Sequence, residues 1–182
     1  MSKHKRTQKT LRNQGYTKGM SVLVVRHGLS QANNRENIGT LAFAAEQAPL
    51  MDQGHEQARI MGELLIAQYG ITPAFTDVAV STLLRTQQTA TSAGFLHVTP
   101  YAALDEIHHH LPLTDLRAML DAGTLPAVAI AEAERTLAHP PAETVWITHG
   151  LRIAALCAVL GVCEQTRLIP KFCEVRELPI DN

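Results

Sequence analysis

The sequence predicts an α/β domain of three layers, in which a mostly parallel central sheet lies between two layers of helices. Short apolar runs alternate with longer helical patterns through most of the chain, an order typical of parallel sheets covered by helices. The first apolar run is continuous and rich in valine, as in strands buried on both faces. Hydrophobic residues make up 46% of the 182 residues, which is enough for one sizeable core.

The first predicted strand is the run SVLVV at residues 21–25. The polar stretch 26–40 that follows is expected to be a loop. A helix is predicted at 53–69, because Asp52 can cap its N-terminus and Gly70 can end it.

The next predicted elements are a strand at 75–80 and a helix at 83–93, which Gly94 closes. A weaker strand is expected at 96–104. Pro100 indicates that this strand lies at an edge of the sheet or is broken, since proline has no N–H for a ladder hydrogen bond.

In the next part of the chain a short helix is expected to end at Gly123, with Thr114 or Asp115 as its cap. The alanine-rich stretch 127–138 is helical by propensity, and the sequence His-Pro-Pro at 139–141 stops it. The last predicted elements are a strand at 144–148, a helix at 151–160 and a closing strand.

The closing strand is expected at 171–178. No internal repeat interrupts this order of elements. The alternation is therefore attributed to a single domain, predicted at 20–182.

Residues 1–19 are polar, basic and without periodicity, and we interpret them as a flexible tail. They hold six of the 16 Lys and Arg residues and no acidic residue, so the rest of the chain is net negative. This balance argues against a general nucleic-acid binder, apart from a weak, salt-sensitive attraction of polyanions to the tail.

The three cysteines are an odd number without a C-x-x-C pair, which argues against a disulfide framework or a zinc site. No apolar run is long enough for a membrane span, and no signal-peptide core follows the basic N-terminus. A cytoplasmic protein is the expectation. Nothing in the sequence bears on its oligomeric state.

Cationic and imidazole side chains follow three of the predicted strands. Arg26 and His27 come after the first strand, Arg85 follows the second, and His149 ends the strand at 144–148. Carboxyl ends of parallel strands share one edge of the sheet, beside helix N-termini that favour anions. We therefore expect these side chains to surround one oxyanion.

The residue types fit a phosphate site. Arginine presents a planar fork of donors that matches phosphate oxygens. A histidine placed among arginines has its charged form disfavoured, so it keeps the lone pair that a nucleophile needs.

Five segments carry a resemblance to a known family. VVRHGLSQAN at 24–33 is similar to the signature of the histidine phosphatase superfamily, which includes the cofactor-dependent phosphoglycerate mutases. The other four resemble further motifs of that family, in the family's order: LMDQGHEQA at 50–58, STLLRTQQTA at 81–90, LDE at 104–106 and THG at 148–150.

The resemblance implies a phosphoglycerate mutase-like fold and a mechanism. His27 would attack phosphorus and form a phosphohistidine, and Glu106 would protonate the leaving oxygen and then activate water. A carboxylate near bound phosphate is expected to have a raised pKa. No metal and no cofactor is implied, because arginines supply the positive charge. The phosphate oxygens would be held by Arg26, Asn33, Arg85 and His149, while Ser30 either touches phosphate or only shapes the turn.

The sequence departs from the family pattern in two places. Leu29 stands where the family often has Glu, and the aromatic-acid-Gly stretch after the acid is replaced by IHHHLP at 107–112. Asp105, Asp115 and Asp121 are therefore alternative proton donors.

The leading function is a phosphomonoesterase with a small phosphorylated substrate, because the chain lacks room for the insertions that close over the sugar acid in the longer mutases. A phosphomutase is the first alternative. A phosphate-binding regulatory module with little turnover is the second.

Two segments are left without an assigned role. His108, His109 and His110 are expected to be a plain loop or a substrate contact, since adjacent side chains diverge and rarely bind one metal ion. The fairly apolar stretch 38–50 fits either a lid or a packed helix.

Overall fold

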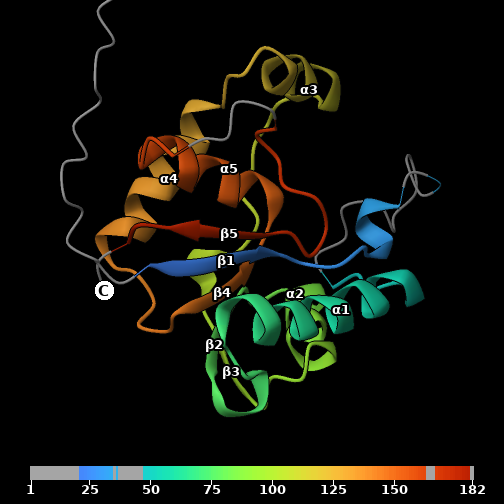
Figure 1. Ribbon diagram of the computed structural model, residues 1–182. Helices are drawn as coiled ribbons and strands as arrows, with labels where there is room; N and C mark the ends of the chain where they lie inside the picture. The colour runs from blue at the N-terminus through green and yellow to red at the C-terminus, as the bar shows by residue number, and fades with distance from the viewer. Residues whose placement is uncertain (1–20, 35, 37–46, 163–166, 181–182) are drawn as a thin grey trace, which may run out of the picture.

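The computed structural model describes residues 21–34, 36, 47–162 and 167–180, and is built on a five-stranded sheet with the order β3-β2-β4-β1-β5 (Figure 1). Strands β3, β2, β4 and β1 are parallel, whereas β5 is antiparallel to β1. The predicted mostly parallel sheet is thus confirmed. The strands are β1 (Val22–Arg26), β2 (Asp77–Val80), β3 (His97–Pro100), β4 (Val145–Thr148) and β5 (Val175–Leu178).

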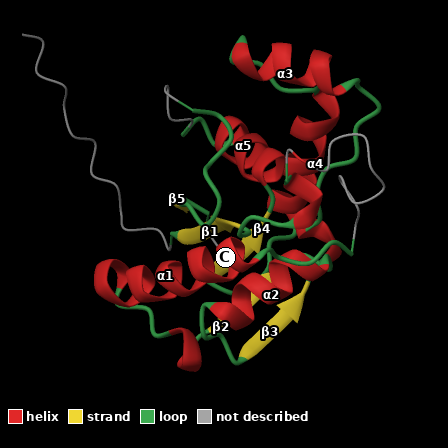
Figure 2. Cartoon of the chain, turned by 90° about the vertical axis from the view of Figure 1, so that its right-hand side faces the viewer, coloured by secondary structure: helices red, strands yellow, loops and turns green. Residues whose placement is uncertain are grey.

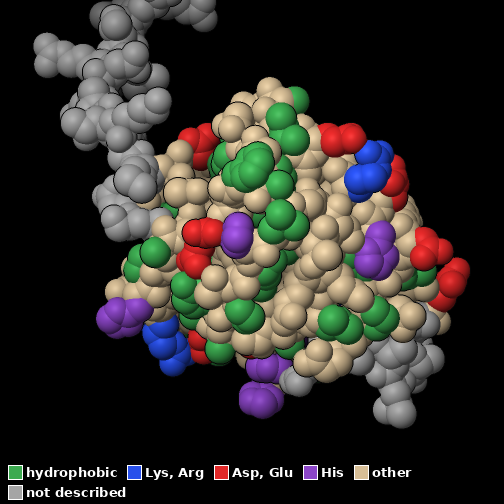
Figure 3. All heavy atoms as spheres, turned by 90° about the horizontal axis from the view of Figure 1, so that it is seen from below, with side chains coloured by type: hydrophobic (Ala, Val, Ile, Leu, Met, Phe, Trp, Pro, Cys, Tyr) green, Lys and Arg blue, Asp and Glu red, His purple; other side chains and the backbone are tan. Residues whose placement is uncertain are grey.

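Helices cover both faces of the sheet, as the three-layer prediction requires. Helices α1 and α2 lie on one face and α4 and α5 on the other, with α3 further out beyond them (Figures 1 and 2). Seen from the α1 and α2 side, charged, polar and hydrophobic side chains are interspersed, as on an ordinary solvent-exposed layer (Figure 3). The helices are α1 (Asp52–Tyr69), α2 (Leu84–Ser92), α3 (Leu113–Asp121), α4 (Ala127–Ala138) and α5 (Gly150–Val159).

Side chains of the central strands alternate between two hydrophobic cores. In β1, Val22 and Val24 face the core beneath α4 and α5, while Leu23 and Val25 face the core beneath α1 and α2. Trp146 of β4 is fully buried in the first of these cores. Burial on both faces explains why the first strand reads as an unbroken apolar run.

The ends of the helices test the sequence predictions in detail. Gly70 has the positive φ of +67° expected of a helix stop. The predicted cap Asp52 is instead the first residue of α1, after Met51, where its charge still favours the helix N-terminus. Helix α3 follows Pro112, so neither Thr114 nor Asp115 caps it.

Short 3₁₀ turns connect several of these elements. The turn η3 (Pro73–Phe75) delays the second strand to Asp77, so the strand predicted at 75–80 begins two residues late. The turn η4 (Ala102–Leu104) leads from the edge strand β3 toward Asp105. The turn η1 (Gln31–Asn33) lies in the loop that follows β1.

The predicted tail at 1–19, most of the stretch 38–50 and Cys163 lie outside the described residues. The domain boundary near residue 20 stays a prediction. Within the described ranges, no helix has the length and apolar character to cross a bilayer.

Candidate active site

The carboxyl ends of β1, β4 and β2 meet at one edge of the sheet because the backbone ladder continues past the strands. The N–H of His27 donates to the carbonyl of Thr148 at 3.0 Å, and the N–H of Ser81 donates to that of Ile147 at 3.1 Å. The rings of His27 and His149 meet edge-on with centroids 5.0 Å apart. The two imidazoles predicted to converge therefore do so.

His27 is held as a neutral imidazole with one nitrogen available. Its ring is buried, and Nδ1 lies 2.7 Å from the carbonyl oxygen of Gly28. A carbonyl only accepts, so Nδ1 carries the proton and Nε2 keeps a lone pair. Burial, followed by the charges of Arg85 and Arg26, holds the pKa of His27 well below its usual value. Burial therefore lowers the pKa of His27 more than the arginine charges do, although the sequence had suggested only the effect of the charges.

The loop that carries His27 is fixed by the two helices beneath it. The N–H of Gly28 donates to Thr89 Oγ1 at 3.0 Å, and the N–H of Leu29 donates to Gln57 Oε1 at 2.9 Å. A Cβ at Gly28 would lie 2.5 Å from the carbonyl oxygen of Gly54, which explains why glycine occupies this position. The segments 50–58 and 81–90 are therefore the support of the loop at 24–33.

Arg26 lies at the same edge with part of its hydrogen-bonding capacity unused. Its Nη1 donates to the carbonyl of Pro170 at 2.8 Å, and its guanidinium carbon lies 3.9 Å from the ring centroid of Phe172. Nε is buried without a hydrogen-bond partner in the part of the chain that the structure describes. Burial lowers the pKa of Arg26 to about 10, so it remains a cation at neutral pH. A Cβ at Gly150 would lie 3.2 Å from Nε, so glycine there leaves room for the guanidinium.

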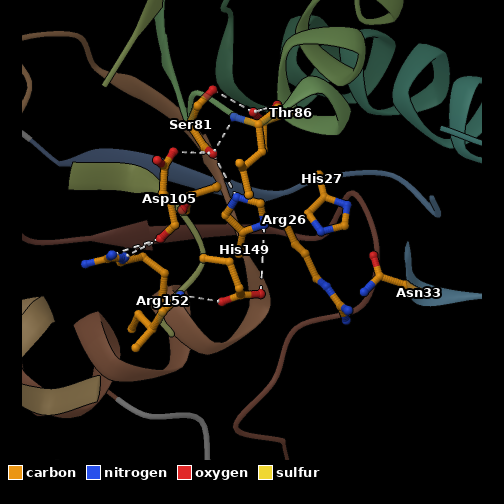
Figure 4. A network of polar contacts seen from close by, with 12 residues as sticks. Arg26, His27, Asn33, Ser81, Thr86, Asp105, His149 and Arg152 are labelled. Carbon is orange, nitrogen blue, oxygen red and sulfur yellow. Dashed lines mark hydrogen bonds and ion pairs between the residues drawn. The ribbon is translucent and has the colours of Figure 1, made fainter. Parts of the chain in front are cut away.

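Arg85 and Asn33 complete the polar surroundings. Arg85 is buried in the first turn of α2, and its charge lowers the pKa of both His27 and Glu106. Ser30 is buried and donates to Asn33 Oδ1 at 2.8 Å, so it orients the amide. In Figure 4 the Asn33 amide points toward the end of Arg26.

Glu106 lies next to His149. Its Oε2 is 3.9 Å from His149 Nδ1, and its Oε1 accepts the N–H of Ile107 at 3.1 Å. Burial raises the pKa of Glu106, against the opposing effects of that N–H and of Arg85 and Arg26. A raised pKa was expected from a bound phosphate, but the protein surroundings already supply one. The carboxyl is thus suited to donate a proton.

The alternative acids are placed differently. Both carboxylate oxygens of Asp105 accept hydrogen bonds from Ser81 and Thr82. Asp115 and Asp121 are exposed on α3. Glu106 is therefore the acid that the geometry favours as proton donor.

The backbone before Glu106 is clamped by side chains from three elements. The carbonyls of residues 103–105 accept, in order, from Thr136 Oγ1 of α4, Thr148 Oγ1 of β4 and the guanidinium of Arg152 of α5. Nε and Nη2 of Arg152 donate to the third carbonyl at 3.0 and 2.8 Å. Sequence reasoning missed Thr136 and Arg152, because no local pattern distinguishes them from ordinary helix positions, and it gave Thr148 only as part of the motif at 148–150.

The histidine run is separate from this network. His109 and His110 line a largely apolar hollow of about 350 Å³ beside Met119 of α3 and Val128 of α4. Among the described residues, no three His, Cys, Asp or Glu side chains are grouped as a metal site would need. Cys157 is buried in the core beneath α4 and α5.

Two kinds of comparison place the chain among known proteins. Residues 22–112 match the family model of the histidine phosphatase superfamily (branch 1). No curated protein matches the sequence.

Several solved structures share the fold. A phosphoserine phosphatase from Entamoeba histolytica, solved in complex with 3-phosphoglyceric acid, superposes with a TM-score of 0.61 at 16% identity, covering 86% of this chain and 89% of that one. A phosphoglycerate mutase from Thermus thermophilus gives 0.56 at 23% identity, covering 83% and 89%. The protein TTHB049 from the same organism gives 0.56 at 24% identity, covering 78% and 85%. These likenesses concern the fold alone.

Proposed function

Because the chain belongs to the histidine phosphatase superfamily (branch 1), we propose that it is a phosphomonoester hydrolase that acts through a phosphohistidine on His27 and needs no metal ion. One observation carries the proposal. The bond from Nδ1 to the Gly28 carbonyl leaves the Nε2 lone pair of a buried, neutral imidazole beside two arginines. A nucleophile is thereby combined with positive charge that can bind its anionic target.

In the first step, Nε2 of His27 attacks phosphorus and the ester P–O bond breaks. Glu106 gives its proton to the departing oxygen, so an alcohol leaves rather than an alkoxide. Arg26 and Arg85 bind the non-bridging oxygens and stabilise the charge that develops on them, with Asn33 contributing its amide.

In the second step, water attacks phosphorus and the N–P bond breaks. The Glu106 carboxylate takes a proton from this water, which restores the acid for the next cycle. Inorganic phosphate is released and His27 regains its lone pair.

The proposal is tested by trapping the intermediate. The protein is mixed briefly with a ³²P-labelled phosphate ester, quenched, and assayed for a protein-bound label that is stable to base and labile to acid. The His27→Ala variant should lose both the label and phosphate release. His97→Ala is the matched control, since His97 is exposed at the opposite end of the sheet and should retain both.

The same assay separates the alternatives. A phosphomutase would require a bisphosphorylated primer and return an isomer, whereas a hydrolase releases inorganic phosphate without one. A regulatory module would bind inorganic phosphate without turning over any ester. Label that persists in His27→Ala would contradict the assignment of the nucleophile.

A further inference from the structure

Asp105 is the start of a short hydrogen-bond chain that ends at His149 (Figure 4). Its Oδ1 accepts from Ser81 Oγ and from the N–H of Thr82, both at 2.7 Å, and its Oδ2 accepts from Thr82 Oγ1 at 2.7 Å. A carboxylate only accepts hydrogen bonds. The hydroxyl proton of Ser81 is therefore committed to Asp105.

Ser81 Oγ can consequently only accept from its other neighbours. It accepts the N–H of Leu83 at 3.1 Å, and His149 Nε2 lies 2.9 Å away. A hydroxyl has one proton, so the proton between Ser81 and His149 must belong to the imidazole. His149 is thereby fixed as the Nε2-protonated tautomer.

The other nitrogen of His149 then faces the reaction centre with a lone pair. Nδ1 is buried, has no hydrogen-bond partner among the described residues, and lies 3.9 Å from Glu106 Oε2. Burial, and then the nearby charges, hold the pKa of His149 well below its usual value, which keeps the ring neutral near pH 7.

We propose that Asp105, acting through Ser81, is a positioning residue that fixes this tautomer and so directs Nδ1 of His149 at the substrate as a proton acceptor. Nδ1 would accept the P–O–H of a phosphate monoanion, or take its proton and then donate it back to the same oxygen. The catalytic consequence rests on the proposed phosphatase function, whereas the tautomer itself does not.

Asp105 sets which atoms donate and which accept in the hydrogen bonds that link it through Ser81 to His149. If its carboxylate is removed, the Ser81 hydroxyl is free to rotate and donate to Nε2. His149 would then carry its proton on Nδ1 and present a donor to Glu106 and to the substrate. The two tautomers differ in which nitrogen carries the proton, a difference that ¹⁵N NMR resolves directly.

The experiment records long-range ¹H–¹⁵N spectra of full-length protein labelled with ¹⁵N-histidine, without substrate, near neutral pH. His149→Gln assigns the signals. We expect His149 to be the Nε2–H tautomer in the unmodified protein and the Nδ1–H tautomer in Asp105→Ala. Asp105→Asn should keep the original tautomer, because the amide oxygen can still accept from Ser81.

Thr82→Val is the matched control. It removes another hydrogen bond of Asp105 without touching Ser81 or His149. If Asp105 has only a general structural role, the His149 tautomer should change in both Asp105→Ala and Thr82→Val. If Asp105 positions His149 through Ser81, the tautomer should change only in Asp105→Ala. If Asp105→Ala does not fold, Ser81→Ala tests the same link: Nε2 loses its acceptor, and both tautomers should be populated.

Turnover gives the second readout. Asp105→Ala should lower kcat by about 10- to 100-fold, and Asp105→Asn by less. An Nδ1–H signal assigned to His149 in the unmodified protein, or an unchanged His149 tautomer in both Asp105→Ala and Ser81→Ala, would overturn the proposal. The expected tautomers together with no phosphate release from any ester would instead contradict only the proposed function.

Discussion

Arg26 of β1 packs against Gly150, and Arg152 of α5 follows that glycine by two residues, but the two guanidinium groups are bonded in opposite ways. All three guanidinium nitrogens of Arg152 are used, on the carbonyls of Asp105 and Glu132 and on Thr136 Oγ1. Arg26 donates once, to Pro170, and keeps a buried Nε without a partner among the described residues.

The contrast separates an arginine that holds the fold together from one that we propose binds an anion. Burying a cation is costly unless its donors are satisfied, so a fully bonded guanidinium holds the fold together. An incompletely bonded one lies in a site where an anion can complete its bonding. Arg152 fixes the backbone next to Glu106, while Arg26 faces the place where we propose that phosphate binds.

Substitution of Arg26 should reduce catalytic efficiency more than any other change considered below. Arg26→Met keeps the length of the side chain and removes the charge, so we expect kcat/KM for a phosphate ester to fall by about 10²- to 10³-fold. The free energy of unfolding should change by less than about 1 kcal/mol, because few hydrogen bonds are lost. Steady-state kinetics and urea denaturation measure the two quantities.

Arg152→Met is the matched substitution and should give the reverse pattern. The Asp105 carbonyl loses both donors, so the free energy of unfolding should fall by about 2–4 kcal/mol. Activity of the folded variant should fall less than in Arg26→Met. The comparison fails if Arg152→Met is as stable as the unmodified protein but less active than Arg26→Met.

Glu106 extends the comparison of the arginines. Arg152 bonds the carbonyl of the preceding residue, and the charges of Arg85, Arg26 and Arg152 all oppose the raised pKa of Glu106. Glu106→Gln cannot donate a proton, so we expect turnover of an alkyl phosphate to fall by about 10²-fold. Turnover of p-nitrophenyl phosphate should fall much less, since nitrophenolate leaves without a proton.

Asp121→Asn is the control for this prediction, because Asp121 is exposed on α3 and should leave both rates unchanged. Equal losses with the two leaving groups in Glu106→Gln would show that Glu106 is not the acid.

The weakest expected effect is the change that His27 causes in the pH dependence of the free energy of unfolding. The folded pKa of His27 lies below its unfolded value of about 6.5, so below that pH the unfolded chain binds a proton that the folded chain does not. The stability that depends on a neutral His27 is fully present above about pH 6.5. As the pH falls from there toward the folded pKa, the free energy of unfolding decreases by about 1.4 kcal/mol per pH unit. His149 acts in the same direction, while Glu106, with its raised pKa, acts in the opposite direction.

Urea denaturation of the unmodified protein and of His27→Gln across this range isolates the contribution of His27. The variant should lose stability less steeply on acidification. Parallel curves would mean that His27 is not held neutral by the fold.

Much of the site was predictable from local patterns. Arginine and histidine side chains at the ends of β1 and β4 indicated where Arg26, His27 and His149 would meet, because parallel strands bring their carboxyl ends to one edge. Gly70 and Gly94 ended their helices as expected, since only glycine readily takes a positive φ.

The partners of these residues were not predictable in the same way. Nothing local marks Arg152 or Thr136 as part of the clamp on residues 103–105, because each is an ordinary residue of a helix. Thr148 lies in the motif at 148–150, but the motif does not show that its hydroxyl bonds the carbonyl of residue 104. A sequence also does not show which group of a hydrogen bond donates, so the sequence analysis identified Asp105 only as an alternative proton donor.

Local sequence was enough to predict which arginine and histidine residues follow the strands and that the sheet is buried on both faces, since periodicity and strand-end composition are local properties. The folded structure was needed to learn which arginine has all its guanidinium nitrogens hydrogen-bonded and which imidazole nitrogen carries a proton. Those states depend on donors and acceptors that come from elements far apart in the chain, and on the burial that makes an unsatisfied group costly.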